Sequence, residues 1–132
     1  MKGRFIIYSN PRSIEVVDEI MNQVYMDCHI DDVVAFKVRL ALSEAINNAI
    51  LHGNASNPKK RVVIDVEDKG DKLYCCVFDE GKGFEVEDVL DPRKTENREK
   101  EGGRGVLFIR EVAEHFHYCN ESHSANFSIK LR

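Results

Sequence analysis

The chain has 132 residues, of which 42% are hydrophobic, and its formal net charge is -4. A chain of this length buries roughly two-thirds of the surface that its unfolded form exposes, so residues 1–132 can form one domain without disulfides. The 19 basic residues against 23 acidic ones give no electrostatic support for nucleic-acid binding. We therefore expect a globular protein that does not bind nucleic acid directly.

The sequence also gives no sign of a membrane segment. The N-terminal apolar run is far too short to span a bilayer, and no signal peptide is visible. Four cysteines lie in apolar stretches without a CxxC pair, which is typical of reduced, buried thiols in a cytosolic protein; they are Cys28, Cys75, Cys76 and Cys119. We expect a cytoplasmic protein without membrane contact.

The N-terminal part of the chain predicts a strand followed by two helices. The strand is Phe5–Tyr8, and apolar residues at helical spacing indicate a first helix after it. A second helix is expected to begin at Asp31 or Asp32, since either aspartate can cap its first turn, and to end at His52. Gly53 follows directly and is predicted to be a left-handed C-cap.

The rest of the chain predicts three more strands and one helix. Val62–Val66 alternates apolar and polar residues, whereas Leu73–Phe78 is apolar on both faces, as in a central strand. Residues 91–105 contain no apolar side chain, which indicates a functional or mobile loop. A helix at Val106–Phe116 and an alternating strand at Ala125–Leu131 follow. The expected fold class is α+β, a two-layer sandwich with helices on one face of a mostly antiparallel sheet.

Polar residues follow one stripe of the second predicted helix. Glu44, Asn48 and His52 recur at i, i+4 spacing, which places them on the same helix face. The Asn48 amide offers a neutral oxygen of the kind that Mg²⁺ binds beside waters and phosphate oxygens. Glu44 could accept a proton from an attacking hydroxyl or water. The alternative is a solvated helix face, and the pair alone favours neither interpretation.

A glycine-rich segment, Asp79–Gly83, directly follows the predicted central strand. An aspartate at a strand end can accept a hydrogen bond from an exocyclic amine such as adenine N6. Gly81 and Gly83 allow a planar ring to approach the backbone. Taken alone, this segment is more typical of an ordinary turn.

A second glycine cluster, Gly102–Gly105, precedes the last predicted helix. Free amides at a helix N-terminus can hold phosphate groups, and Arg104 could add a charged contact. The alternative is a flexible hinge. Three potential metal ligands also alternate along His115–Cys119. We expect ordinary packing rather than zinc there, because no second ligand cluster lies nearby in the sequence.

In this order and spacing, the clusters resemble the GHKL superfamily of Bergerat-type ATP-binding domains. Its N box resembles Glu44–Gly53, its G1 box resembles Asp79–Gly83, and its G2 box resembles Gly102–Gly105. Within the superfamily, the chain resembles bacterial anti-sigma factor serine/threonine kinases, the switch-protein kinases of sporulation and stress regulation. The resemblance covers nearly the whole chain.

The resemblance implies a role for each matching position. Asn48 would hold Mg²⁺, Asp79 would bind adenine, and Glu44 would be the general base that activates a substrate serine. The glycine-rich positions would shape the adenine pocket and the phosphate-binding lid; they are Gly81, Gly83, Gly103, Arg104 and Gly105.

The implied function is that of an anti-sigma factor with protein-serine kinase activity. Such a protein binds Mg-ATP, sequesters a sigma factor and phosphorylates a serine on an anti-anti-sigma (STAS-type) protein, commonly as a homodimer. Two alternatives remain: an ATP-gated partner-switch module without kinase activity, and a slow ATPase in which Glu44 activates water. No motif in the sequence identifies the partners.

Overall fold

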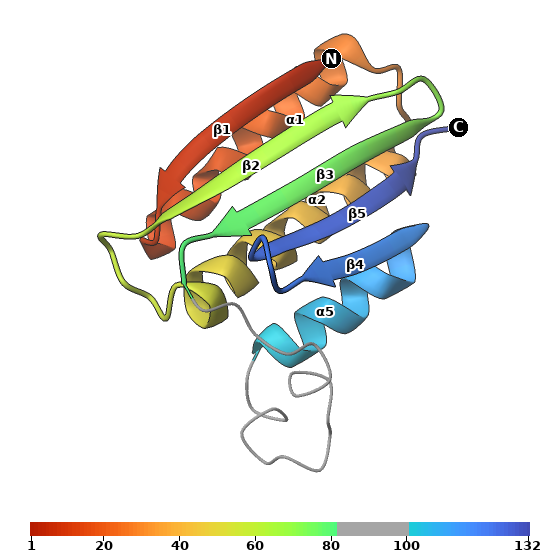
Figure 1. The fold of residues 1–132 in the computed structure, drawn as a ribbon. Coiled ribbons are helices and arrows are strands. Elements are labelled where there is room, and N and C mark those ends of the chain that lie inside the picture. The colour runs from red at the N-terminus through yellow and green to blue at the C-terminus, as the bar shows by residue number, and fades with distance from the viewer. Residues whose placement is uncertain (82–100) are drawn as a thin grey trace.

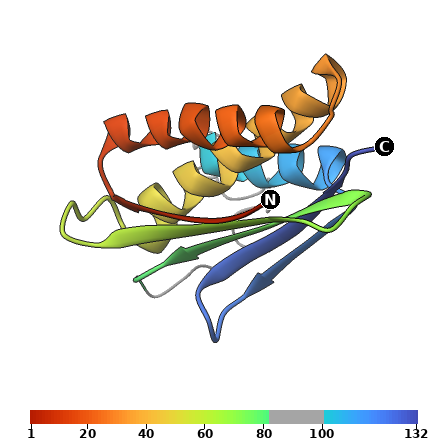
Figure 2. The same ribbon diagram turned by 90° about the horizontal axis from the view of Figure 1, so that it is seen from above.

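The computed structural model describes the backbone of residues 1–81 and 101–132, and the side chains of residues 1–81 and 106–132. Gly83 and most of the apolar-free loop therefore lie outside the described residues. The described chain forms a sheet with helices on one face only, as Figures 1 and 2 show. This arrangement confirms the predicted α+β sandwich. No described helix is long and apolar enough to cross a membrane.

The sheet has five strands and is antiparallel throughout. The strands are β1 (Lys2–Tyr8), β2 (Arg61–Asp68), β3 (Lys72–Asp79), β4 (His115–Cys119) and β5 (Ser124–Lys130). They are ordered β1-β2-β3-β5-β4, so β3 is the middle strand, as its apolar pattern predicts. In the β1–β2 pair Phe5 is opposite Ile64.

The helical elements lie along one face of this sheet (Figure 2). A short 3-10 turn, η1 (Pro11–Glu15), leads into α1 (Val16–Asp27). Helix α2 (Asp32–Asn48) continues without a break into a π-helical turn, η2 (Ala49–Gly53). Helix α5 (Glu101–Val112) packs beside α2, so α2 lies between the other two helices (Figure 1).

Two sequence predictions about helix ends differ from the structure. Gly53 is not a left-handed C-cap but the last residue of η2, and the positive φ among the described glycines is at Gly70, in the β2–β3 turn. The last helix covers Glu101–Val112 rather than Val106–Phe116. Phe116 belongs to strand β4, because Phe116 and Tyr118 face the core at alternate positions, a period-2 pattern that excludes a helix.

The hydrophobic core lies between the helices and the inner face of the sheet. Each helix buries residues at spacings of three and four, while the strands bury every second residue. The largest fully buried side chains include Ile20, Met21, Leu42, Ile46, Ile64, Leu73, Ile109 and Ile129. The opposite face of the sheet is not covered by any described helix (Figure 2).

One buried amide joins the strand ends nearest to η2. Asn54 is only 1% exposed, and its Nδ2 donates to Ser9 Oγ at 2.8 Å and to the Arg61 carbonyl at 2.9 Å. Its Oδ1 accepts a hydrogen bond from the Glu80 N–H at 2.7 Å. A single side chain thus ties together the segments at the end of β1, the start of β2 and the end of β3.

We predict that Asn54→Ala lowers the free energy of unfolding by about 2–4 kcal/mol, because it leaves buried polar partners without hydrogen bonds. Urea denaturation measures the change. Asn57→Ala is the matched control, since Asn57 is exposed and its side chain accepts a local hydrogen bond from the Lys59 N–H in the same loop; it should change stability by less than about 1 kcal/mol. Equal stabilities of the two variants would contradict this role of Asn54.

Candidate functional site

The carboxylate of Asp79 lies buried at the end of the central strand. Its side chain is 1% exposed. The Gly81 N–H donates to Oδ1 at 2.9 Å, the Tyr118 hydroxyl donates to Oδ2 at 3.1 Å, and His123 Nδ1 lies 3.6 Å from Oδ1. Burial raises the pKa of Asp79 above its ordinary value, and these hydrogen bonds and His123 only partly oppose that shift. The Asp79 carboxylate is therefore a hydrogen-bond acceptor shielded from water, which suits it to bind a hydrogen-bond donor of a ligand.

Two glycines allow the backbone to approach this carboxylate closely. A Cβ on Gly53 would lie 2.3 Å from Cγ and Oδ2 of Asp79, and a Cβ on Gly81 would lie 1.4 Å from the Gly53 carbonyl oxygen. Neither position therefore accepts a side chain without rearrangement. Gly53 is therefore required because a side chain would collide with Asp79, and not because its backbone is left-handed; Gly81 is required because its backbone packs against that of Gly53.

Asn48 provides a buried oxygen near the same end of the sheet. It is the last residue of α2 and 3% exposed, and its Oδ1 has no hydrogen-bond partner among the described residues. A buried carbonyl oxygen of this kind is unfavourable unless it meets a donor or a cation. Within the described part of the chain, no group of three His, Cys, Asp or Glu residues could bind a metal. Asn48 therefore fits a partial ligand for Mg²⁺, which takes its other ligands from phosphate and water.

Glu44 lies one helical turn before Asn48 on α2. The residue is partly exposed, while its Oε2 atom is buried. Because η2 continues α2 directly, Glu44, Asn48 and Gly53 lie along one continuous helical segment. Gly53, at the end of this segment, lies against Asp79. The N-terminal and central motifs of the sequence thus meet at one end of the sheet.

The second glycine cluster differs from its prediction. Gly103, Arg104 and Gly105 belong to the first turns of α5, which begins at Glu101, rather than to a loop before the helix. Helix α5 packs beside α2 (Figure 1), so this cluster begins the helix next to the one that carries Glu44 and Asn48. Gly83 is outside the described residues.

Three residues of this region were not predicted from the sequence. Tyr118 lies on β4, a strand that no pattern in the sequence predicted, so its hydroxyl could not be placed. His123 has a positive φ of 53° and its carbonyl accepts the Asp79 N–H at 2.9 Å, which no local pattern indicates. Asn54 follows the Glu44–Gly53 motif directly, and its burial depends on contacts far apart in sequence.

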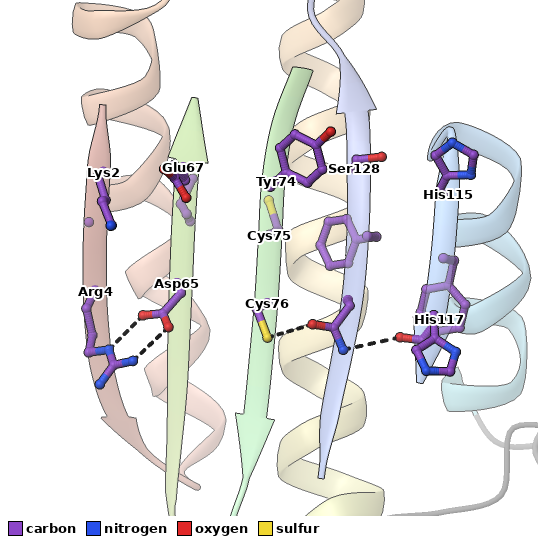
Figure 3. A pocket seen from close by; sticks show the side chains of 15 residues that line it. Lys2, Arg4, Asp65, Glu67, Tyr74, Cys75, Cys76, His115, His117 and Ser128 are labelled. Carbon is purple, nitrogen blue, oxygen red and sulfur yellow. Dashed lines mark hydrogen bonds and ion pairs between the residues drawn. The ribbon is translucent and has the colours of Figure 1, made fainter. Parts of the chain in front are cut away.

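A large hollow of about 870 Å³ lies on the opposite, uncovered face of the sheet (Figure 3). It contains an ion pair between Arg4 and Asp65 at 2.7 Å and the Cys76 thiol, which donates to Asn126 Oδ1 at 2.9 Å. None of the residues predicted for the nucleotide site lines it. His115 and His117, expected to be packed, are instead exposed on edge strand β4 along its rim.

Known proteins resemble this chain over part or all of its length. An anti-sigma F factor from Anoxybacillus flavithermus is 35% identical over 75 residues, which cover 55% of this chain and 51% of that protein. An anti-sigma F factor from Clostridium botulinum is 28% identical over 101 residues, covering 67% of this chain and 69% of that protein. The chain thus spans about half the length of the first of these relatives.

A solved structure and a family profile agree with the fold. The crystal structure of the RsbU and RsbW domains of a Mycobacterium tuberculosis protein superimposes with a TM-score of 0.63 over 100% of this chain and 32% of that one, at 13% identity. At this identity the likeness concerns the fold alone. The sequence profile of the histidine kinase-like ATPase domain matches residues 7–127. The chain therefore belongs to the histidine kinase-like ATPase domain family.

Proposed function

We propose that this protein is an anti-sigma factor with protein-serine kinase activity. It binds Mg-ATP, sequesters a sigma factor and phosphorylates a serine on an anti-anti-sigma protein in the cytoplasm. The observation that carries the proposal is the buried Asp79 carboxylate, held by Gly81 and Tyr118 directly against Gly53. The anti-sigma F factors among the relatives support the choice of partner class.

The proposed adenine site follows from the chemistry of Asp79. A buried carboxylate accepts hydrogen bonds only, so it pairs with the exocyclic amine of adenine. Guanine presents a carbonyl at the equivalent position, and that oxygen would face the carboxylate without a proton between them. The lack of side chains at Gly53 and Gly81 lets the two backbone segments pack directly against each other and against Asp79, which fixes the carboxylate where it can meet the adenine amine.

The proposed phosphoryl transfer uses Asn48 and Glu44. Asn48 Oδ1 would hold Mg²⁺, which when bound neutralises charge on the phosphate oxygens. Glu44 takes the proton from the substrate serine hydroxyl, and the serine oxygen then forms a bond to the γ-phosphorus. The bond between the γ-phosphorus and the bridging oxygen breaks, and ADP leaves with that electron pair. Gly103, Arg104 and Gly105 are proposed to contact the phosphates from the first turns of α5.

Two other functions use the same nucleotide site. An ATP-gated partner-switch module would bind partners without transferring phosphate, and a slow ATPase would use Glu44 to activate water. We further propose that the protein acts as a homodimer, as the resemblance to switch-protein kinases implies.

We predict that Asp79→Ala weakens ATP binding by about 10- to 100-fold, the value of a charge-assisted hydrogen bond, and that the parent binds GTP poorly. Isothermal titration calorimetry with both nucleotides measures these affinities. Asp65→Ala is the control, since Asp65 pairs with Arg4 on the uncovered sheet face. Equal affinities of the parent for ATP and GTP would exclude this role for Asp79.

We predict that ATP affinity falls on acidification at a higher pH than an ordinary aspartate would cause. The pKa of Asp79 is raised, so as the pH falls its carboxylate is protonated at a higher pH and then becomes a weaker, uncharged acceptor. Its neutral form is the one that burial favours, so Asp79 stabilises the fold at acidic pH and this contribution is lost as the pH rises through the raised pKa.

The test of this pH dependence is Tyr118→Phe. The Tyr118 hydrogen bond lowers the pKa of Asp79, so its removal should move the acidic limb of ATP affinity to still higher pH. Affinity is measured against pH for both proteins, and the titration of ATP itself cancels in the comparison. Superimposable curves would show that Tyr118 does not tune the carboxylate.

We predict that Glu44→Gln binds Mg-ATP normally but transfers phosphate about 10²- to 10⁴-fold more slowly, because the amide has no basicity. Transfer of radiolabel from ATP to purified STAS-type proteins of the same genome measures the rate. Glu19→Gln, an exposed change on α1, is the matched control. Transfer by Glu44→Gln at the parent rate would rule out Glu44 as the base, and absence of transfer by the parent would favour the partner-switch module.

A further inference from the structure

Helix α2 carries apolar residues on two opposite faces. One face, which includes Ala35, Val38 and Leu42, is buried against the core. The other face includes Val33 and Phe36, which are each 63% exposed, and Leu40, which is partly exposed. We call Val33, Phe36 and Leu40 the α2 stripe. A helix that is apolar on two faces usually has a partner on both.

The α2 stripe is a continuous surface rather than scattered residues. Its members are spaced i, i+3 and i+7, so they are neighbours on one helix face. That face points away from the sheet, because α2 buries its opposite side and lies between α1 and α5 (Figures 1 and 2). Leu107 and Phe108, both exposed on the adjacent helix α5, add apolar surface to the same layer. Contiguous exposed apolar residues of this kind mark interaction sites.

The α2 stripe leads directly to Glu44. Phe36, Leu40 and Glu44 are successive i, i+4 positions, so Leu40 is about 6 Å and Phe36 about 12 Å from Glu44 along the helix axis. A typical protein interface buries about 800 Å² per partner, a patch about 30 Å across. A protein that brings a serine hydroxyl to Glu44 with its interface centred there therefore covers Leu40 and Phe36 as well.

We propose that the α2 stripe is the docking surface for the phosphoacceptor protein. The inference rests on the proposed kinase function and adds the surface that positions the substrate. The partner is a folded protein that presents its acceptor serine beside an apolar patch of its own. The apolar contact at Phe36 and Leu40 supplies affinity, while Glu44 at the end of the stripe receives the serine hydroxyl.

The experiment measures transfer from Mg-ATP to the STAS-type protein that the parent phosphorylates, for Phe36→Ser and Leu40→Ser. Both side chains lie at the surface, so the variants should fold. Each should raise the KM for the acceptor at least about tenfold, equivalent to about 1.4 kcal/mol, with kcat and Mg-ATP affinity within about twofold of the parent. Ile6→Ser is the matched control: Ile6 is 56% exposed but lies on β1, on the uncovered sheet face.

Several results would overturn the proposal. An unchanged acceptor KM in both variants removes the stripe as a docking surface. Dissociation of a dimer by Phe36→Ser, seen by sedimentation, would assign the stripe to a second copy of the chain.

Failure of the kinase itself has a different signature, because the parent then transfers no phosphate to any STAS-type protein. Calorimetric binding of the same proteins decides that case. Weaker binding to Phe36→Ser than to the parent supports docking at the stripe. Equal binding to the two proteins, or no binding to the parent, overturns it.

Discussion

The burial of the Asp79 carboxylate constrains three of the segments that meet at its end of the sheet. A charged group removed from water is unfavourable by several kcal/mol unless hydrogen bonds replace the lost hydration. Gly81 and Tyr118 supply those bonds, and Gly53 leaves the space that the carboxylate occupies. The end of β3, the π-helical turn after α2 and strand β4 are therefore fixed relative to one another around one side chain.

Asn54 has a complementary role on the other side of Gly53. Its amide binds groups from three separate segments, and the Glu80 carboxylate, next to Asp79, pairs with Arg61 at 2.8 Å. The strand ends are thus held by polar contacts where the hydrophobic core stops. Asn48 differs from this pattern, because its buried oxygen has no partner in the described part of the chain. Such a position indicates that the site is not optimised for the stability of the fold alone.

Much of the fold follows from local patterns in the sequence. The alternation in β2 and β5, the central character of β3 and the Asp31 cap of α2, which accepts the Val34 N–H at 2.8 Å, are all predictable because periodicity and capping act over a few residues. Strand β4 was not predicted, because its five residues follow a helix directly and gain their structure from pairing with β5.

The residues of the candidate site divide in the same way, into those placed by the local sequence and those placed by contacts between distant parts of the chain. Asp79 and Gly81 were predictable from their position after a buried strand. Tyr118 and His123 were not, since both reach Asp79 from about forty residues away along the chain, through the antiparallel pairing of β3, β5 and β4. Gly53 was predicted to be a left-handed C-cap, which is wrong; steric contact with Asp79, and not backbone dihedrals, requires a glycine there.

The uninterrupted course of α2 into η2 has a thermodynamic consequence. The helix has 17 residues and is about 25 Å long, so the proposed protein-docking stripe and Asn48, the proposed magnesium ligand, belong to one continuous helix. If nucleotide binding moves or stiffens this helix, the binding of ATP and the binding of the partner protein are coupled through it. Linkage then makes the coupling reciprocal: by whatever factor ATP alters the affinity for a protein on the outer face of α2, that protein alters the affinity for ATP by the same factor.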